Sequence, residues 1–106
     1  MAKYQFQLND NHDVLSVTIS DPKFDASGVR EFKKQFDHYW DDRVNSVAFD
    51  LSAVRFIDSS GIGALLGIRK RVKGKKTPMI ILNAQPTVVS IIELLHLQRV
   101  FTLRNT

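Results

Sequence analysis

The chain has 106 residues, the size of one domain, and we expect residues 1–106 to fold as a single unit. It contains no cysteine, which excludes a disulfide scaffold and thiolate metal sites, and 43% of its residues are hydrophobic, enough for one core. The formal net charge of +4 permits acidic partners without indicating a fold. No apolar run has the length of a signal peptide or a membrane span, so we expect a soluble, cytoplasmic protein without membrane insertion.

The first elements predicted along the chain form a β-hairpin. Residues 4–8 and 15–19 alternate between apolar and polar side chains, which places the apolar set of each segment on one face of a half-buried strand. The intervening residues 9–12 are typical of a turn. The second strand ends at Asp21-Pro22, because proline cannot donate a hydrogen bond to a strand ladder.

After the hairpin, the sequence alternates between helical and strand patterns. Apolar residues recur at three- and four-residue steps from about 25 to 42, which predicts a helix with one buried face. We then expect a strand over 44–51, a helix to about Lys73 capped by Gly74, a strand over 79–82, a helix after Pro86 and a strand over 100–103. This order predicts an α/β domain with a mixed central sheet, an N-terminal hairpin and about three to four helices covering at least one face.

The tetrad Asp58-Ser59-Ser60-Gly61 lies where a short extended segment leads into the second long helix. Asp58 or Ser59 can accept hydrogen bonds from the free N–H groups of the first helical turn, which is a purely structural role. By the same rule, Asp25 or Ser27 can cap the first helix. Just beyond the tetrad, Gly63 and Ala64 are expected to allow close packing of the second helix.

The position of the tetrad suits a phosphate as well as a cap. A helix N-terminus carries a partial positive charge and free N–H donors, so the domain itself would tolerate a phosphoserine there. The phosphate would add about −1.5 to −2 charges at pH 7. A partner that presents apolar or acidic groups at that spot would then lose affinity. The residues alone leave the capping and the switching interpretations open.

The residues show no catalytic arrangement, and we expect a protein that is not an enzyme and that requires no metal or cofactor. The serines of the tetrad lack the Gly-x-Ser-x-Gly pattern of α/β-hydrolases, and the glycines that follow lack the Gly-Lys-Ser/Thr ending of a P-loop. The acids and the histidine within residues 37–42 lie on the helix that carries Phe36 and Trp40. We interpret them as solvated charges opposite an apolar face.

The basic run Arg69–Lys76 offers a competing interpretation. Such a run can bind nucleic acid or an anionic surface. It also suits the solvated C-terminal end of a helix, where the helix dipole favours cations. No aromatic residue interleaves the run, so a base-stacking platform is not indicated, and we do not expect nucleic acid to be the partner.

The segment from Asp50 to Gly67 resembles the signature of the STAS-domain family, the anti-sigma-factor antagonists. Residues 58–63, Asp-Ser-Ser-Gly-Ile-Gly, match the family pattern at each position. Phe24-Asp25 stands where the family has Leu-Asp before its first long helix, and residues 90–97 resemble the third helix of the family and the turn behind it. The resemblance covers nearly the whole chain.

The resemblance implies partner switching. In the family, the unphosphorylated antagonist binds an anti-sigma factor that is also a serine kinase of the GHKL type. Phosphorylation separates the complex, and a PP2C-type phosphatase restores the binding form. The family acceptor is the first hydroxyl after the aspartate, which corresponds to Ser59, with Ser60 as second choice. Asp58 would orient that hydroxyl or help the metal of the kinase, and Gly61 would leave the backbone approachable. The expected partner-binding surface consists of Asp25, Asp58, Ser59, Ser60, Gly61 and Ile62.

The resemblance leaves two further alternatives. Some relatives dock onto transporter ATPases without a phosphorylation cycle, and both kinds of protein keep the same turn. Some members of the family bind nucleotides, so weak nucleotide binding is compatible with the resemblance, although no residue pattern here indicates it independently.

Overall fold

The computed structural model describes residues 3–72 and 79–106. Its main layer is a five-stranded sheet in the order β1-β2-β4-β6-β7. The strands are β1 (Tyr4–Leu8), β2 (Val14–Ile19), β4 (Ser46–Asp50), β6 (Met79–Leu82) and β7 (Thr102–Arg104). β1 pairs with β2 in antiparallel fashion and every other neighbouring pair is parallel, which confirms the predicted mixed sheet with its N-terminal hairpin.

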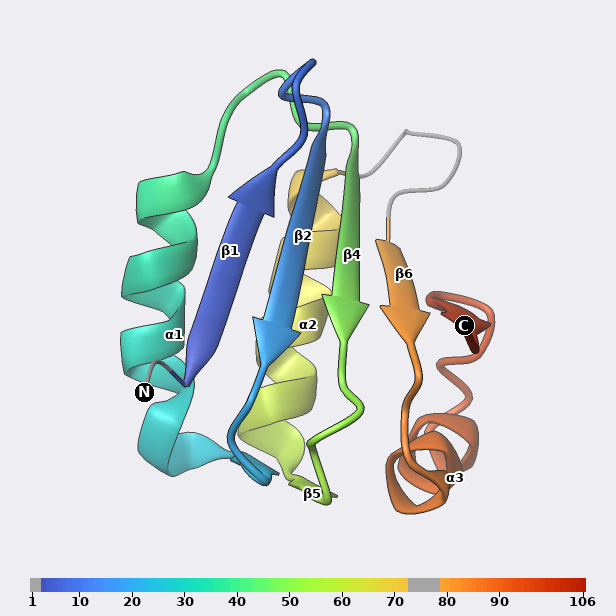
Figure 1. Ribbon diagram of the computed structural model, residues 1–106. Coiled ribbons are helices and arrows are strands. Elements are labelled where there is room, and N and C mark those ends of the chain that lie inside the picture. Colours follow the sequence, from blue (N-terminus) through green and yellow to red (C-terminus); the bar gives the residue numbers. More distant parts are fainter. Residues whose placement is uncertain (1–2, 73–78) are drawn as a thin grey trace.

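The described part of the chain contains three α-helices: α1 (Ala26–Tyr39), α2 (Ser59–Arg71) and α3 (Pro86–Leu94). Figure 1 shows α1 and α2 lying behind the sheet, with α3 beside the end of β6. The predicted positions of the helices are confirmed, although α1 ends before Asp42 and α2 ends at Arg71 rather than Lys73. The expected C-cap, Gly74, lies outside the described residues.

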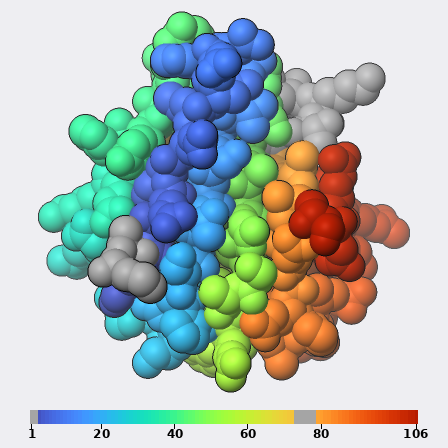
Figure 2. Space-filling model, in the orientation of Figure 1, coloured from blue at the N-terminus to red at the C-terminus, as the bar shows by residue number. Residues whose placement is uncertain are grey.

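The two faces of the sheet differ because strand side chains alternate in direction. Val17, Phe49 and Ile81 are neighbours across β2, β4 and β6, and all three are buried beneath the helices. The other face, seen in Figure 2, shows the strands side by side. Phe32 of α1 joins the two layers, with its ring centroid 6.2 Å from that of Phe49 and 5.0 Å from that of Phe24.

A second, two-stranded sheet was not predicted from the sequence. Its strands, β3 (Lys23–Phe24) and β5 (Phe56–Ile57), are parallel and pair Lys23 with Phe56 and Phe24 with Ile57. The carbonyl oxygen of Pro22 accepts hydrogen bonds from the N–H groups of Arg55 and Phe56 at 2.7 and 3.0 Å. Two-residue strands are too short for a periodic pattern, so the signal that predicted the longer strands is missing here.

The small sheet determines where two helices begin. β2 and β4 run parallel, so their carboxyl ends lie at the same edge of the main sheet. The chain leaves this edge twice, through β3 into α1 and through β5 into α2, and the N-terminal ends of both helices lie at the bottom of the view in Figure 1. Loops at the carboxyl ends of parallel strands are the usual location of functional sites in open α/β sheets.

Candidate functional site

Two aspartates follow directly after the paired strands of the small sheet, one after β3 and one after β5. Phe24 pairs with Ile57, and each is followed by an aspartate, Asp25 and Asp58. Each aspartate is the N-cap residue of the helix that follows it, α1 or α2. The backbone therefore places two helix caps at one end of the molecule.

Asp25 caps α1, which confirms the prediction that Asp25 or Ser27 has this role. Its Oδ1 accepts hydrogen bonds from the backbone N–H of Ser27 at 3.0 Å and from the hydroxyl of Ser27 at 2.5 Å. The hydroxyl donor is the largest cause of a pKa for Asp25 below its ordinary value, because it stabilises the ionised carboxylate. The Asp25 side chain is thus held as an anion at the first turn of α1.

Asp58 caps α2 and also contacts α1. Its Oδ1 accepts from the N–H of Gly61 at 2.9 Å, and its Oδ2 accepts from the N–H of Ala26 at 3.2 Å. Of the two cap residues considered from the sequence, Asp58 or Ser59, the structure selects Asp58. One carboxylate therefore satisfies a free donor in the first turn of each helix.

Ser59 and Ser60 differ in their surroundings. Ser59 is the first residue of α2 and its side chain is exposed, whereas Ser60 is half-buried and lines a hollow together with Arg30 and Lys33 of α1. Neither serine hydroxyl is hydrogen-bonded to another residue within the described part of the chain. Ser59 is therefore the more accessible hydroxyl at the start of α2.

Gly61 and Ile62 lie beneath this surface rather than on it. Gly61 is buried, and Ile62 has only 5% of its surface exposed. A Cβ atom at Gly61 would lie 2.2 Å from the carbonyl oxygen of Phe24 and 2.7 Å from Cγ1 of Ile57. The expectation that Gly61 leaves the backbone approachable to a partner is therefore wrong, because the β3 backbone and Ile57 occupy the space beside it.

The expectation of close packing at Gly63 is wrong, because no atom lies within 4 Å of a Cβ built there and the residue is exposed. Ala64, by contrast, is buried as expected. The glycine that α2 needs for close approach is Gly61, two residues earlier.

The structure brings together the six residues of the expected surface, but only Asp25, Asp58, Ser59 and Ser60 reach solvent to some degree.

The sequence matches the family model of the STAS domain over residues 5–106. The chain belongs to the STAS-domain family. The α/β architecture described above is the STAS fold, and the resemblance first noted in residues 50–67 extends through the chain.

Solved structures of several other proteins share this fold. A STAS domain protein from Planctomyces limnophilus, described as an anti-sigma-factor antagonist, superimposes with a TM-score of 0.80 at 20% identity, over 99% of this chain and 91% of that one. An anti-sigma factor antagonist from Mycobacterium paratuberculosis gives 0.77 at 24% identity, over 97% and 86%. The phosphorylated form of SpoIIAA, a cell fate determinant of Bacillus, gives 0.70 at 18% identity, over 94% and 89%.

The structure reveals one residue of the STAS surface that the sequence pattern did not single out. Phe56 lies two residues before Asp58, and 49% of its surface is exposed. Its strand neighbour Ile57 points inward and is buried, so the alternation of β5 directs the phenyl ring of Phe56 to solvent. An exposed aromatic ring three residues before Ser59 in the chain is a suitable anchor for a protein partner.

The basic run of the STAS domain lies only partly within the described residues. Arg69, Lys70 and Arg71 occupy the last turn of α2, where cations suit the helix dipole, and residues 73–76 are outside the description. Arg71 is engaged with α1: its guanidinium lies 2.8 Å from the carboxylate of Asp37 and 5.3 Å from the ring centroid of Trp40.

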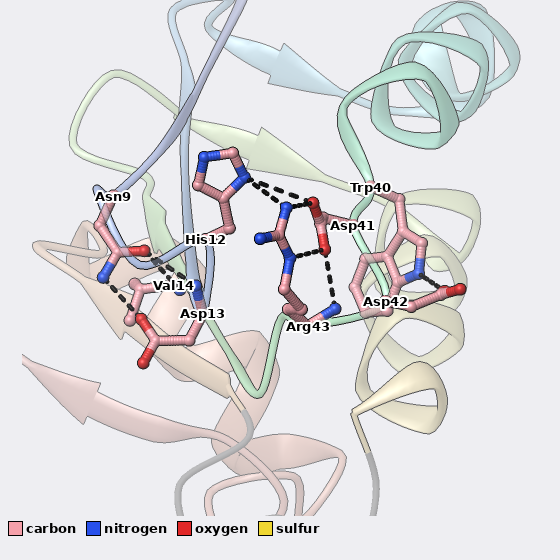
Figure 3. Close-up of polar contacts among 8 residues, drawn as sticks. All are labelled: Asn9, His12, Asp13, Val14, Trp40, Asp41, Asp42 and Arg43. Atoms are coloured by element: carbon pink, nitrogen blue, oxygen red, sulfur yellow. Dashed lines mark hydrogen bonds and ion pairs between the residues drawn. The ribbon is translucent and has the colours of Figure 1, made fainter.

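The interpretation of Asp41 and Asp42 as solvated charges on the first helix is wrong, because both follow α1 and both accept side-chain hydrogen bonds, at the end of the molecule opposite the serines (Figure 3). Asp41 accepts hydrogen bonds from Nε and Nη2 of Arg43 at 3.0 and 2.8 Å, and these donors hold the pKa of Asp41 well below its ordinary value. Nη2 of Arg43 also lies 2.9 Å from Nδ1 of His12, in the turn between β1 and β2. This cluster links two loops far from the serines.

Residues 3–72 and 79–106 contain neither a metal-binding cluster nor a membrane-spanning helix. No group of three or more histidine, cysteine, aspartate or glutamate side chains in these ranges has a geometry that could hold a metal ion. No helix in the same ranges is both long enough and apolar enough to span a bilayer.

Proposed function

We propose that the chain is an anti-sigma-factor antagonist of a partner-switching circuit in which Ser59 is the switch. In this proposal the unphosphorylated form binds an anti-sigma factor that is also a GHKL-type serine kinase. Phosphorylation of Ser59 separates the two proteins, and a PP2C-type phosphatase restores binding. The proposed role is that of a cytoplasmic, non-catalytic binding protein, whose chemistry is performed on it by other proteins.

The observation that carries the proposal is the exposed hydroxyl of Ser59 at the first residue of α2. A kinase can reach this hydroxyl without unfolding the helix, because the cap is provided by Asp58 and not by the serine itself. A phosphate there would lie at the positive end of the helix dipole, so the fold would tolerate it. Membership of the STAS family and the shared fold with a solved phosphorylated STAS protein support the same assignment.

A phosphate at Ser59 would change the surface more than the fold. It would bring about −1.5 to −2 charges to the end of the molecule where α1 and α2 begin, beside the caps Asp25 and Asp58 and close in sequence to the exposed Phe56. A partner fitted to the apolar and uncharged parts of this end of the molecule would have to desolvate the phosphate. A loss of about 1.4 kcal/mol in binding free energy would already weaken the complex tenfold.

The proposal is tested by mapping phosphate on the protein purified from its own cells. Phosphopeptide mass spectrometry is expected to locate the phosphate on Ser59, and deletion of the gene for the co-purifying kinase is expected to remove it. The matched variants are Ser59→Ala, which should abolish labelling, and Ser60→Ala, which should retain it. Ser59→Asp should weaken the complex with the kinase, whereas Ser60→Ala should leave it intact.

Three results would contradict the proposal. Labelling that persists in Ser59→Ala and disappears in Ser60→Ala would move the switch to the second serine. Equal kinase binding by the wild-type protein and Ser59→Asp would remove the switch. Recovery of a transporter ATPase in place of a GHKL-type kinase would support the non-switching subunit role.

A further inference from the structure

A groove runs between α1 and α2 on the helical side of the domain. One hollow of about 210 Å³ has Phe32, Phe36, Ala64 and Ile68 among its lining residues and also reaches Gly67 and Arg71. A second hollow of about 330 Å³ is lined by Ala26, Val29, Arg30, Lys33 and Ser60. Lys33 lines both hollows, which are therefore neighbours between α1 and α2 and are together called the α1–α2 groove.

The floor of the α1–α2 groove is apolar and closely packed, and Gly67 opens its α2 side. Phe32 and Phe36 are almost fully buried, and Ala64 retains 3% of its surface. On the α2 side, Gly67 is exposed, and no atom lies within 4 Å of a Cβ built on it. Small residues at this position leave room for the backbone of another element to lie close to α2.

The rim of the groove is cationic. Arg30 and Lys33 are exposed, and neither forms a salt bridge with any residue in the described ranges. The acid on the rim, Asp37, is already paired with Arg71 at 2.8 Å. The groove therefore presents uncompensated positive charge above an apolar floor.

We propose that the α1–α2 groove binds an acidic amphipathic helix of a partner protein. A helix in a groove of this kind contributes apolar residues at i, i+3, i+4 and i+7 to the floor, and its flanking positions meet the rim. Carboxylates at those positions would complement Arg30 and Lys33 and would favour this partner over a basic one. From Ser60 to Arg71 the groove follows α2 for roughly 16 Å, which a partner helix of about three turns would cover.

The groove also connects with the proposed switch, and this link rests on the proposed function. Ser60 lines one end of the groove and is adjacent to Ser59. A phosphate on Ser59 would bring negative charge to the end where an acidic helix has to dock. Phosphorylation would then repel the same partner helix that the cations attract.

The test uses two synthetic peptides and needs neither kinase nor phosphate. Both are 14-residue helices with leucine at the same i, i+3, i+4 and i+7 positions, one with glutamate and one with lysine at the flanking positions. Each is titrated into the full-length ¹⁵N-labelled chain. We expect the glutamate peptide to shift amide resonances of residues 30–37 and 60–71 saturably, with an affinity that falls as salt is added. The lysine peptide should leave these resonances unchanged.

Three variants make the test specific. The double variant Arg30→Glu, Lys33→Glu should weaken the glutamate peptide roughly tenfold or more, because charge complementarity becomes repulsion. Lys34→Glu is the matched control, since Lys34 is an exposed neighbour on α1 that does not line the groove, and it should bind as wild type. Gly67→Leu should block binding by filling the groove, and its circular dichroism spectrum should show the helices intact.

Several outcomes would overturn the proposal. They are equal binding of the two peptides, equal loss of binding in Lys34→Glu, shifts confined to the open face of the sheet, or stronger shifts of the same residues with a duplex DNA oligonucleotide. These outcomes are independent of the switch. If the peptide does not bind, the proposal that Ser59 is phosphorylated is unaffected. If Ser59 is not phosphorylated, the proposal that the groove binds an acidic helix is unaffected.

Discussion

The carboxylate of Asp58 joins the first turns of two helices by accepting a hydrogen bond from the backbone N–H of Ala26, 32 residues earlier in the chain, at 3.2 Å. Its other oxygen caps its own helix through Gly61. Asp58 therefore has a structural role on both oxygens, whether or not the proposed phosphorylation of Ser59 takes place. Loss of the side chain should therefore affect the fold as well as any switch.

Asp58→Ala should lower the free energy of unfolding by about 1–2 kcal/mol, the usual effect of removing an N-cap. Asp58→Asn should have a smaller effect, because asparagine keeps one acceptor oxygen for one of the two N–H donors. Urea denaturation followed by circular dichroism measures both. Asp10→Ala is the control, since Asp10 is exposed in the turn between β1 and β2. The free energy of unfolding of this variant should stay within about 0.5 kcal/mol of wild type. Equal stability of Asp58→Ala and Asp10→Ala would show that the bond between the helices contributes nothing.

Gly61 and Gly63 are two residues apart on α2 but should respond to alanine in opposite directions. The Cβ of Gly61→Ala would meet the carbonyl oxygen of Phe24 at 2.2 Å, so backbone has to move, and we expect a loss of about 1–3 kcal/mol. Gly63→Ala adds a methyl group in open space within a helix, and we expect a gain of about 0.5–1 kcal/mol. Thermal unfolding of the two variants side by side measures the difference, and a stabilised Gly61→Ala would contradict the packing described for β3 and α2.

Much of the architecture could be predicted because it depends on periodic burial. The alternation in residues 4–8 and 15–19 reports which side of the hairpin faces α1, and the helical spacing of Val29, Phe32 and Phe36 reports the face of α1 that covers the sheet. Caps were predictable to within a pair of residues, because few side chains can accept from a helix N-terminus. The choice of Asp58 over Ser59 needed the structure.

The candidate site was harder to predict because its shape depends on pairings between distant segments. The contact between β3 and β5 aligns residues 23–24 with 56–57, and no local pattern in either segment predicts this pairing. The sequence does not distinguish the roles of Gly61 and Gly63 for the same reason, because the difference depends on the position of the Phe24 carbonyl. The exposure of Phe56 and the approach of Arg30 and Lys33 to Ser60 likewise follow from tertiary packing.

The carboxylate of Asp25 should titrate below its ordinary pKa of 3.8, chiefly because the hydroxyl of Ser27 donates to it. A pKa that is lower in the folded than in the unfolded state stabilises the fold above the unfolded value. That contribution is lost as the pH falls from the unfolded value through the folded pKa. Ser27→Ala should move the midpoint of Asp25 upward toward 3.8 in a carboxyl-detected NMR titration.

Ser20→Ala serves as the control for this titration, because Ser20 is an exposed serine that makes no side-chain hydrogen bond to Asp25. Its Asp25 midpoint should equal that of the wild-type protein. A midpoint that is unchanged by Ser27→Ala would show that the serine hydroxyl does not bind the carboxylate in solution.

Arg71 connects the end of α2 to α1 through two kinds of contact. Its guanidinium pairs with Asp37 at 2.8 Å and lies over the rings of Phe36 and Trp40 at 5.7 and 5.3 Å. Both partners of the ion pair are substantially exposed, so the pair itself should contribute at most about 1 kcal/mol, and the cation–π contact about 0.5–1 kcal/mol. Arg71→Ala should therefore lower the free energy of unfolding by about 1 kcal/mol once solvent screening is considered.

Two further variants separate these contributions of Arg71. Arg71→Lys keeps the charge but not the planar group that lies on the rings, so it should recover only part of the loss. A double-mutant cycle with Asp37→Ala should give a coupling of about 0.2–1 kcal/mol that shrinks as salt is added.

Trp40 is the only tryptophan of the chain, so its fluorescence reports on the stacking directly. Emission should change in Arg71→Ala and remain unchanged in Asp37→Ala if the cation stays on the ring without its carboxylate. An emission spectrum that is identical in all variants would place Arg71 away from Trp40 in solution.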